Sequence, residues 1–141
     1  MAQWFEVKVR FDKMQENGSV KKVFEPYLVD ALSFSEAEAR VSEEVTPFIS
    51  GEFSIHAEKK TKISEIFFNE GDKYHLVKVA FITLDEKTGA EKRTFTYILV
   101  QANDFDSALA NFKEGMKGTM ADWEIASVAE TQIMDVFKAK L

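Results

Sequence analysis

The chain has 141 residues, 45% hydrophobic and 13% aromatic, which is enough to bury a core as one domain. Its formal net charge of -6 excludes a protein that holds duplex nucleic acid or an anionic membrane by bulk positive charge, so such contacts need a local patch. Cysteine is absent, which excludes disulfides and thiolate metal sites.

The start of the chain, Met1 to Glu6, lacks the basic and apolar segments of a signal peptide. No stretch approaches the ~18 consecutive apolar residues of a membrane span. We therefore expect a cytoplasmic protein without a membrane partner.

The first predicted element is a strand over residues 4–11. Phe5, Val7, Val9 and Phe11 alternate with polar or amphipathic residues, the period of two that is typical of a strand with one solvated face. The pair Asn17-Gly18 follows and is typical of a hairpin turn, so we expect a second strand to return antiparallel to the first.

A helix is predicted after the second strand. Ser33 stands three residues before Glu36, a spacing that favours reciprocal capping of a helix start. The apolar residues then recur at helical spacing, and the helix is expected to end near Pro47 and Gly51. The predicted stripe consists of Phe34, Ala37, Val41, Val45 and Phe48.

The segment from Glu52 to Phe68 completes the first half of the chain. Its length fits a single bent strand, and it also fits a strand followed by a second short one around residues 62–67. The sequence leaves both interpretations open, here and at residues 123–137 of the second half.

The second half of the chain repeats the first. Residues 4–11, 27–39 and 53–67 align with residues 74–81, 98–110 and 123–137, with four of eight, six of thirteen and four of fifteen positions identical. Thr88-Gly89 takes the place of the first hairpin turn, and Asp104 and Gly118 suit the two ends of a second helix.

These patterns predict an α+β fold made by tandem duplication of a strand-strand-helix-strand unit. We expect one domain, 1–141, in which residues 1–70 form the first repeat and 71–141 the second. An antiparallel or mixed sheet should carry the two helices on one face. The two repeats could share one continuous sheet or form a pseudo-twofold pair.

Three stretches carry a family resemblance. Glu25 to Arg40, Gly115 to Asp122 and Glu130 to Phe137 resemble a bacterial and phage family catalogued only as a domain of unknown function. The resemblance spans nearly the whole chain, and it implies no activity, cofactor or catalytic residue.

The residues also give no support to an enzyme. His56 and His75 stand apart from each other and from carboxylates at metal-ligand spacing, and we expect His56 on a solvated face and His75 in the core. Nucleophile-elbow and phosphate-binding glycine motifs are absent. We predict a non-enzymatic protein with no metal and no cofactor, and keep an unrecognised type of enzyme as a third alternative.

Basic and aromatic residues share strand positions that should face away from the helices. Such a surface suits single-stranded nucleic acid, because bases stack on rings while cations follow the backbone. We therefore predict a non-enzymatic single-stranded nucleic acid binding module. Its predicted binding residues are Trp4, Lys8, Arg10, Tyr74, Lys78, Lys92 and Arg93.

A competing prediction is a protein-interaction or assembly module. Leu76, Ala80 and Ile82 form an apolar strip on the same predicted face of residues 74–82. Such a strip is typical of a buried surface, either between the repeats or in a homodimer, or where a phage or bacterial partner binds.

Overall fold

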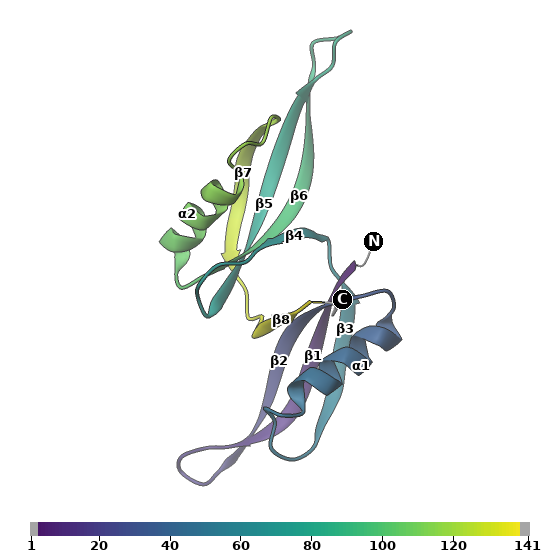
Figure 1. Ribbon diagram of the computed structural model, residues 1–141, viewed down its shortest axis with the longest axis vertical. Helices are drawn as coiled ribbons and strands as arrows, with labels where there is room; N and C mark the ends of the chain where they lie inside the picture. The colour runs from purple at the N-terminus through teal and green to yellow at the C-terminus, as the bar shows by residue number, and fades with distance from the viewer. Residues whose placement is uncertain (1–2, 139–141) are drawn as a thin grey trace. The chain divides into compact units, whose positions relative to one another are not determined.

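The computed structural model describes residues 3–138 and divides into two compact units (Figure 1). Unit 1 consists of Met1–Thr61 and Gln132–Leu141, and unit 2 consists of Lys62–Thr131. These compact units and the predicted repeats, 1–70 and 71–141, are different divisions of the chain.

Unit 1 is a four-stranded sheet in the order β3-β1-β2-β8, with one helix. β1 pairs antiparallel with both β2 and β3, whereas β8 adds to β2 in parallel. Its elements are β1 (Gln3–Met14), β2 (Val20–Ala31), α1 (Phe34–Val45), β3 (Phe53–Lys60) and β8 (Asp135–Phe137).

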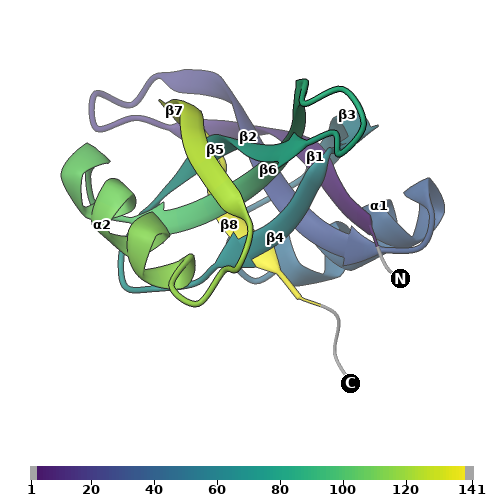
Figure 2. The same cartoon turned by 90° about the horizontal axis from the view of Figure 1, so that it is seen from above.

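Unit 2 has the corresponding order, β4-β6-β5-β7, and again one helix (Figure 2). β5 pairs antiparallel with β6 and β7, and β4 adds to β6 in parallel. Its elements are β4 (Ile63–Phe67), β5 (Lys73–Leu84), β6 (Glu91–Ala102), α2 (Phe105–Gly115) and β7 (Asp122–Glu130).

The last segment of each half is split into two strands, which decides between the two interpretations left open by the sequence. The short strand that follows the split leaves its own half of the chain: β4 completes the sheet of unit 2, and β8 completes the sheet of unit 1. Thr61 anchors the first split by donating from its backbone N and its Oγ1 to the Trp4 carbonyl, at 2.9 and 2.8 Å. Thr131 makes the same two bonds to the Tyr74 carbonyl, at 2.9 and 2.8 Å.

The structure is therefore α+β, with mixed sheets. It differs from the expected single sheet carrying two helices on one face, because it contains two sheets and each helix packs against its own. The parallel edge strands account for this difference, because the outermost strand of each sheet, β8 or β4, is a short strand from the other half of the sequence.

The predicted hairpins and strand faces are confirmed. Gly18 and Gly89 adopt positive φ, 85° and 70°, at the turns that connect β1 to β2 and β5 to β6. Phe5, Val7 and Val9 are fully buried beneath α1, where they form the core of unit 1 with β2 and helix residues. The corresponding core of unit 2 is built from residues of β5, β6 and α2.

Both helices begin at the predicted caps. Ser33 accepts a hydrogen bond from the Glu36 N–H at 3.1 Å, while the Glu36 carboxylate accepts from Leu32 rather than from Ser33. Asp104 caps α2 through the Ser107 N–H at 2.7 Å. The prediction that Phe48 belongs to the buried stripe of the first helix is wrong: α1 ends at Val45, and the Phe48 side chain is 78% exposed.

Candidate nucleic-acid interface

Each sheet has a helix-free face, opposite the face on which its helix packs. In unit 1, Trp4, Lys8 and Arg10 alternate with the buried core residues of β1 and therefore lie on the helix-free face. All three are half-buried. The structure thus brings these three predicted residues onto one surface.

Cross-strand pairing adds two aromatic side chains to this surface. Arg10 lies opposite Phe24 of β2, and a register shift in the β1–β3 pairing leaves His56 between the residues opposite Lys8 and Val9. The rings of Phe24 and His56 meet edge to face, with centroids 4.7 Å apart. Phe24 is 43% exposed and His56 is exposed, as predicted, so this aromatic pair is open to solvent.

The same position in unit 2 is occupied by Phe95. Its ring is 48% exposed, and the Lys78 Nζ lies 4.4 Å from the ring centroid, within the range of a cation–π contact. Lys78 is half-buried on β5, opposite Tyr97. A basic residue beside an exposed phenylalanine is therefore present on the helix-free face of each unit.

The other predicted residues of unit 2 are less suited to binding. Tyr74 is buried, with only 4% of its surface exposed, and offers no ring face to solvent. Arg93 lies on the helix-free face but forms ion pairs with Glu91 and Glu124, and the hydrogen bond to Glu124 raises the pKa of its guanidinium. Lys92 alternates with Arg93 and therefore lies on the helix-bearing side of β6.

The predicted site residues are thus distributed over two sheets. Lys8 lies in the sheet of unit 1 and Lys78 in that of unit 2, so they are not neighbours in one sheet. Of the apolar strip, Ala80 is buried and Leu76 and Ile82 are half-buried.

Sequence reasoning missed Phe24 and Phe95. A signal was present, because Val23 to Tyr27 of the first half aligns with Thr94 to Ile98 of the second at the same offset as the neighbouring matched segment. Val23 and Phe24 are consecutive apolar residues, and this hides the alternation that would have assigned the face of Phe24.

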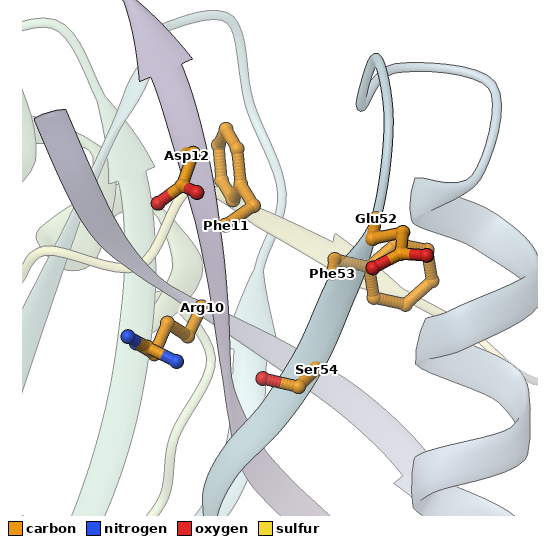
Figure 3. Close-up of a pocket in the computed structure, with 6 residues that line it drawn as sticks. All are labelled: Arg10, Phe11, Asp12, Glu52, Phe53 and Ser54. Atoms are coloured by element: carbon orange, nitrogen blue, oxygen red, sulfur yellow. The ribbon is translucent and has the colours of Figure 1, made fainter. Parts of the chain in front are cut away.

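A small hollow adjoins the helix-free face at the end of β1 and β3. It has a volume of about 190 Å³ and is lined by residues 10–12 and 52–54. Figure 3 shows Arg10 and Phe53 on opposite sides of the sheet, with Phe53 directed toward the helix. Asp12 and Glu52 also line this hollow, so its two carboxylates outnumber the one guanidinium and do not favour a phosphate inside it.

Among the described residues, few titratable side chains have a pKa shifted in a way that suggests a catalytic role. Burial, together with the charge of Glu38, raises the pKa of Glu58 on the helix-bearing side of unit 1. His75 is buried, as predicted, and its Nδ1 has no hydrogen-bond partner among the described residues. Within residues 3–138, no three His, Asp or Glu side chains are grouped as ligands for a metal ion.

Neither helix in the part of the chain that the structure describes is long and apolar enough to cross a membrane. The fold and this surface define an α+β protein with two mixed four-stranded sheets, each exposing a phenylalanine near basic residues.

The chain belongs to the family described as a domain of unknown function (DUF4494), which matches residues 3–139. Comparison with curated proteins found no match, and comparison with solved structures found none either.

Proposed function

We propose that this protein is a non-enzymatic binding module that holds single-stranded nucleic acid on the helix-free faces of its sheets. The observation that carries the proposal is the recurrence of an exposed phenylalanine beside basic residues, Phe24 in unit 1 and Phe95 in unit 2. Each ring supplies a stacking platform, and Lys8 and Lys78 supply cations for the phosphates.

The energies favour a single strand over a duplex. Stacking of a base on an aromatic side chain contributes about 1–3 kcal/mol, and it requires unpaired bases. The net charge of -6 opposes long-range attraction of any nucleic acid, so binding has to come from these local groups. We therefore expect weak, salt-sensitive binding with little sequence preference.

The test is fluorescence anisotropy of a labelled single-stranded oligonucleotide at low and moderate salt. Phe24→Ala and Phe95→Ala should each weaken binding about tenfold, the equivalent of ~1.4 kcal/mol of lost stacking. Lys8→Glu with Lys78→Glu should abolish it.

Two matched controls lie off the helix-free faces. Phe105→Ala removes an exposed ring, 52% exposed, at the start of α2, and Lys92→Glu reverses a charge on the helix-bearing side of β6. Both should bind within about twofold of the parent chain. An equal loss in the controls, or no binding by the parent at low salt, would refute the proposal.

A second candidate is a protein-interaction or assembly module, acting as a homodimer or with another protein. It is favoured by the exposed apolar side chains of Met14, Val20 and Phe48 in unit 1, which are 74%, 61% and 78% exposed.

We also propose that the protein works in the cytoplasm, because the absence of cysteine suits a reducing compartment.

We further propose that the chain arose by duplication of an ancestral unit whose copies exchanged their short final strands. Supporting this origin, the matched pairs Thr61/Thr131 and Trp4/Tyr74 make the same two hydrogen bonds where the chain changes units. The chain would then fold as one domain, because neither sheet is complete without a strand from the other half.

A further inference from the structure

A β-bulge occurs at the equivalent place in the outer strand of each unit. In unit 1 the register of the β1–β3 ladder shifts after Lys8, and His56 of β3 is the residue left without a partner. In unit 2 the β5–β7 ladder shifts after Lys78, and Ala126 of β7 is left without a partner. A bulge changes the direction of the side chain at the extra position. The two units therefore share this irregularity of the backbone and differ in the side chain that it presents.

The bulge in unit 1 allows the imidazole to reach across the neighbouring strand. His56 lies on β3 and Phe24 on β2, with β1 between them in the sheet, and their ring centroids are nevertheless 4.7 Å apart. The two rings therefore meet above β1 on the helix-free face, beside the position of Lys8. His56 is exposed, and within residues 3–138 its ring nitrogens form no hydrogen bond. An N–H of this ring is therefore available to a ligand.

The equivalent position in unit 2 offers no ring. The methyl side chain of Ala126 is too short to reach across β5, and the Lys78 Nζ contacts Phe95, 4.4 Å from the ring centroid. Phe24 and Phe95 are similarly exposed, 43% and 48%, so each provides a stacking surface. We therefore expect the imidazole to be the group through which the two units bind bases differently.

The inclination of the two rings determines which part of a base His56 can contact. The planes of the Phe24 and His56 rings form an angle of 64°. A base stacked in parallel on Phe24 is therefore steeply inclined to the imidazole, which can contact the rim of the base. In a single strand this rim is accessible, including the edge that carries the N7 acceptor in both purines. Pyrimidines have no nitrogen acceptor on the corresponding edge.

We propose that His56 makes unit 1 selective for purines by donating its N–H to N7 of a base that stacks on Phe24. This inference rests on the proposed nucleic-acid function, and it gives unit 1 a preference that unit 2 lacks. The net contribution of one such hydrogen bond corresponds to a roughly fivefold change in affinity.

The test is a two-dimensional NMR titration of the full chain at low salt with two single-stranded tetranucleotides. One contains adenine and the other 7-deazaadenine, which keeps the stacking surface of the base and replaces the N7 acceptor with a C–H group. Amide signals of β1 and β2 report binding to unit 1, and those of β5 and β6 report binding to unit 2. Unit 1 should bind adenine about fivefold more tightly than 7-deazaadenine, whereas unit 2 should bind both within about twofold.

Two substitutions at His56 separate the hydrogen bond from the contact between the rings. His56→Ala removes the imidazole, and His56→Phe keeps a ring beside Phe24 but has no N–H in its side chain. In both variants unit 1 should lose its preference, so that its two affinities agree within about twofold. Because His56 is exposed, both variants should fold, and unit 2 of the same chain is the internal reference.

The possible outcomes separate this role of His56 from the function on which it rests. The role is refuted, and nucleic acid binding stands, if unit 1 binds adenine and 7-deazaadenine equally. It is refuted in the same way if the preference of unit 1 persists in His56→Phe. If the signals of neither unit respond to either oligonucleotide, the proposed function fails and the role of His56 fails with it.

Discussion

Unit 1 and unit 2 share one arrangement of strands around a helix, yet they differ in the side chains at equivalent positions. Both keep the threonine that anchors the change of unit, Thr61 or Thr131, with the same two bonds to a carbonyl. By contrast, fully buried Phe5 in unit 1 corresponds to His75 in unit 2. The backbone anchors are the same in the two units, whereas the residue at this core position differs.

The helix-bearing sides differ in a second way. In unit 1, burial and the charge of Glu38 on α1 raise the pKa of Glu58 on β3, and the corresponding residues of unit 2 are Leu109 and Val128. Unit 2 therefore has two apolar residues at the positions where unit 1 has two carboxylates. The same arrangement of strands and helix therefore forms with either pair of residues, and exchanging residues between the units tests how much each pair contributes to stability.

The largest effect is expected from Phe5→His, which gives unit 1 the residue of unit 2. Phe5 is fully buried and meets Phe34 edge to face, with ring centroids 5.1 Å apart. An imidazole there loses this packing and buries polar atoms, at a cost of about 3 kcal/mol in the free energy of unfolding. Urea denaturation measures the loss, and Phe34→His, at a ring that is 41% exposed, is the control expected to cost far less.

The next effect concerns Gly71, which lies in unit 2 shortly before the first residue of β5. A Cβ on Gly71 would lie 2.3 Å from the Ala102 carbonyl carbon, and φ is +144°. Gly71→Ala should therefore cost about 2–3 kcal/mol, since the backbone has to move. Gly18→Ala is the matched control, because φ is +85° but the space is open. Equal thermal shifts for the two variants would show that the approach to Ala102 is unimportant.

The reciprocal exchange, His75→Phe, should stabilise unit 2. The buried His75 Nδ1 has no partner among the described residues, and removing an unsatisfied polar atom gains about 1 kcal/mol. The gain should appear as slower amide exchange in β5 and β6 only. A destabilised variant would mean that the site lacks room for the larger ring.

Much of this fold was predictable from local patterns, since alternation located the core of β1 and the glycine turns located both hairpins. The exchange of β4 and β8 was not, because strands of five and three residues carry little pattern and their parallel partners lie far away in sequence. For the site, alternation placed Lys8 and Arg10 correctly on one face. The burial of Tyr74 and the neutralisation of Arg93 depend on neighbours in the folded chain, which the spacing of residues in the sequence does not reveal.

The smallest expected effect on stability is also the one that depends on pH. Burial and Glu38 raise the pKa of Glu58 in the folded chain above its unfolded value, so the ionised carboxylate opposes folding. This penalty is present at neutral pH and is relieved as the pH falls through the folded pKa. Glu58→Val, the residue of unit 2, should therefore raise stability at neutral pH by only about 0.5 kcal/mol, because solvent screens this pair.

The gain from Glu58→Val should shrink on mild acidification, as the parent chain takes up the proton that removes the repulsion. Thermal denaturation at neutral and mildly acidic pH measures both values, and Glu58→Gln separates loss of charge from added apolar packing. If the gain is the same at both pH values, it comes from apolar packing against α1 and not from relief of the repulsion by Glu38. The stability difference at this position is then due to the shape of the side chain and not to its charge.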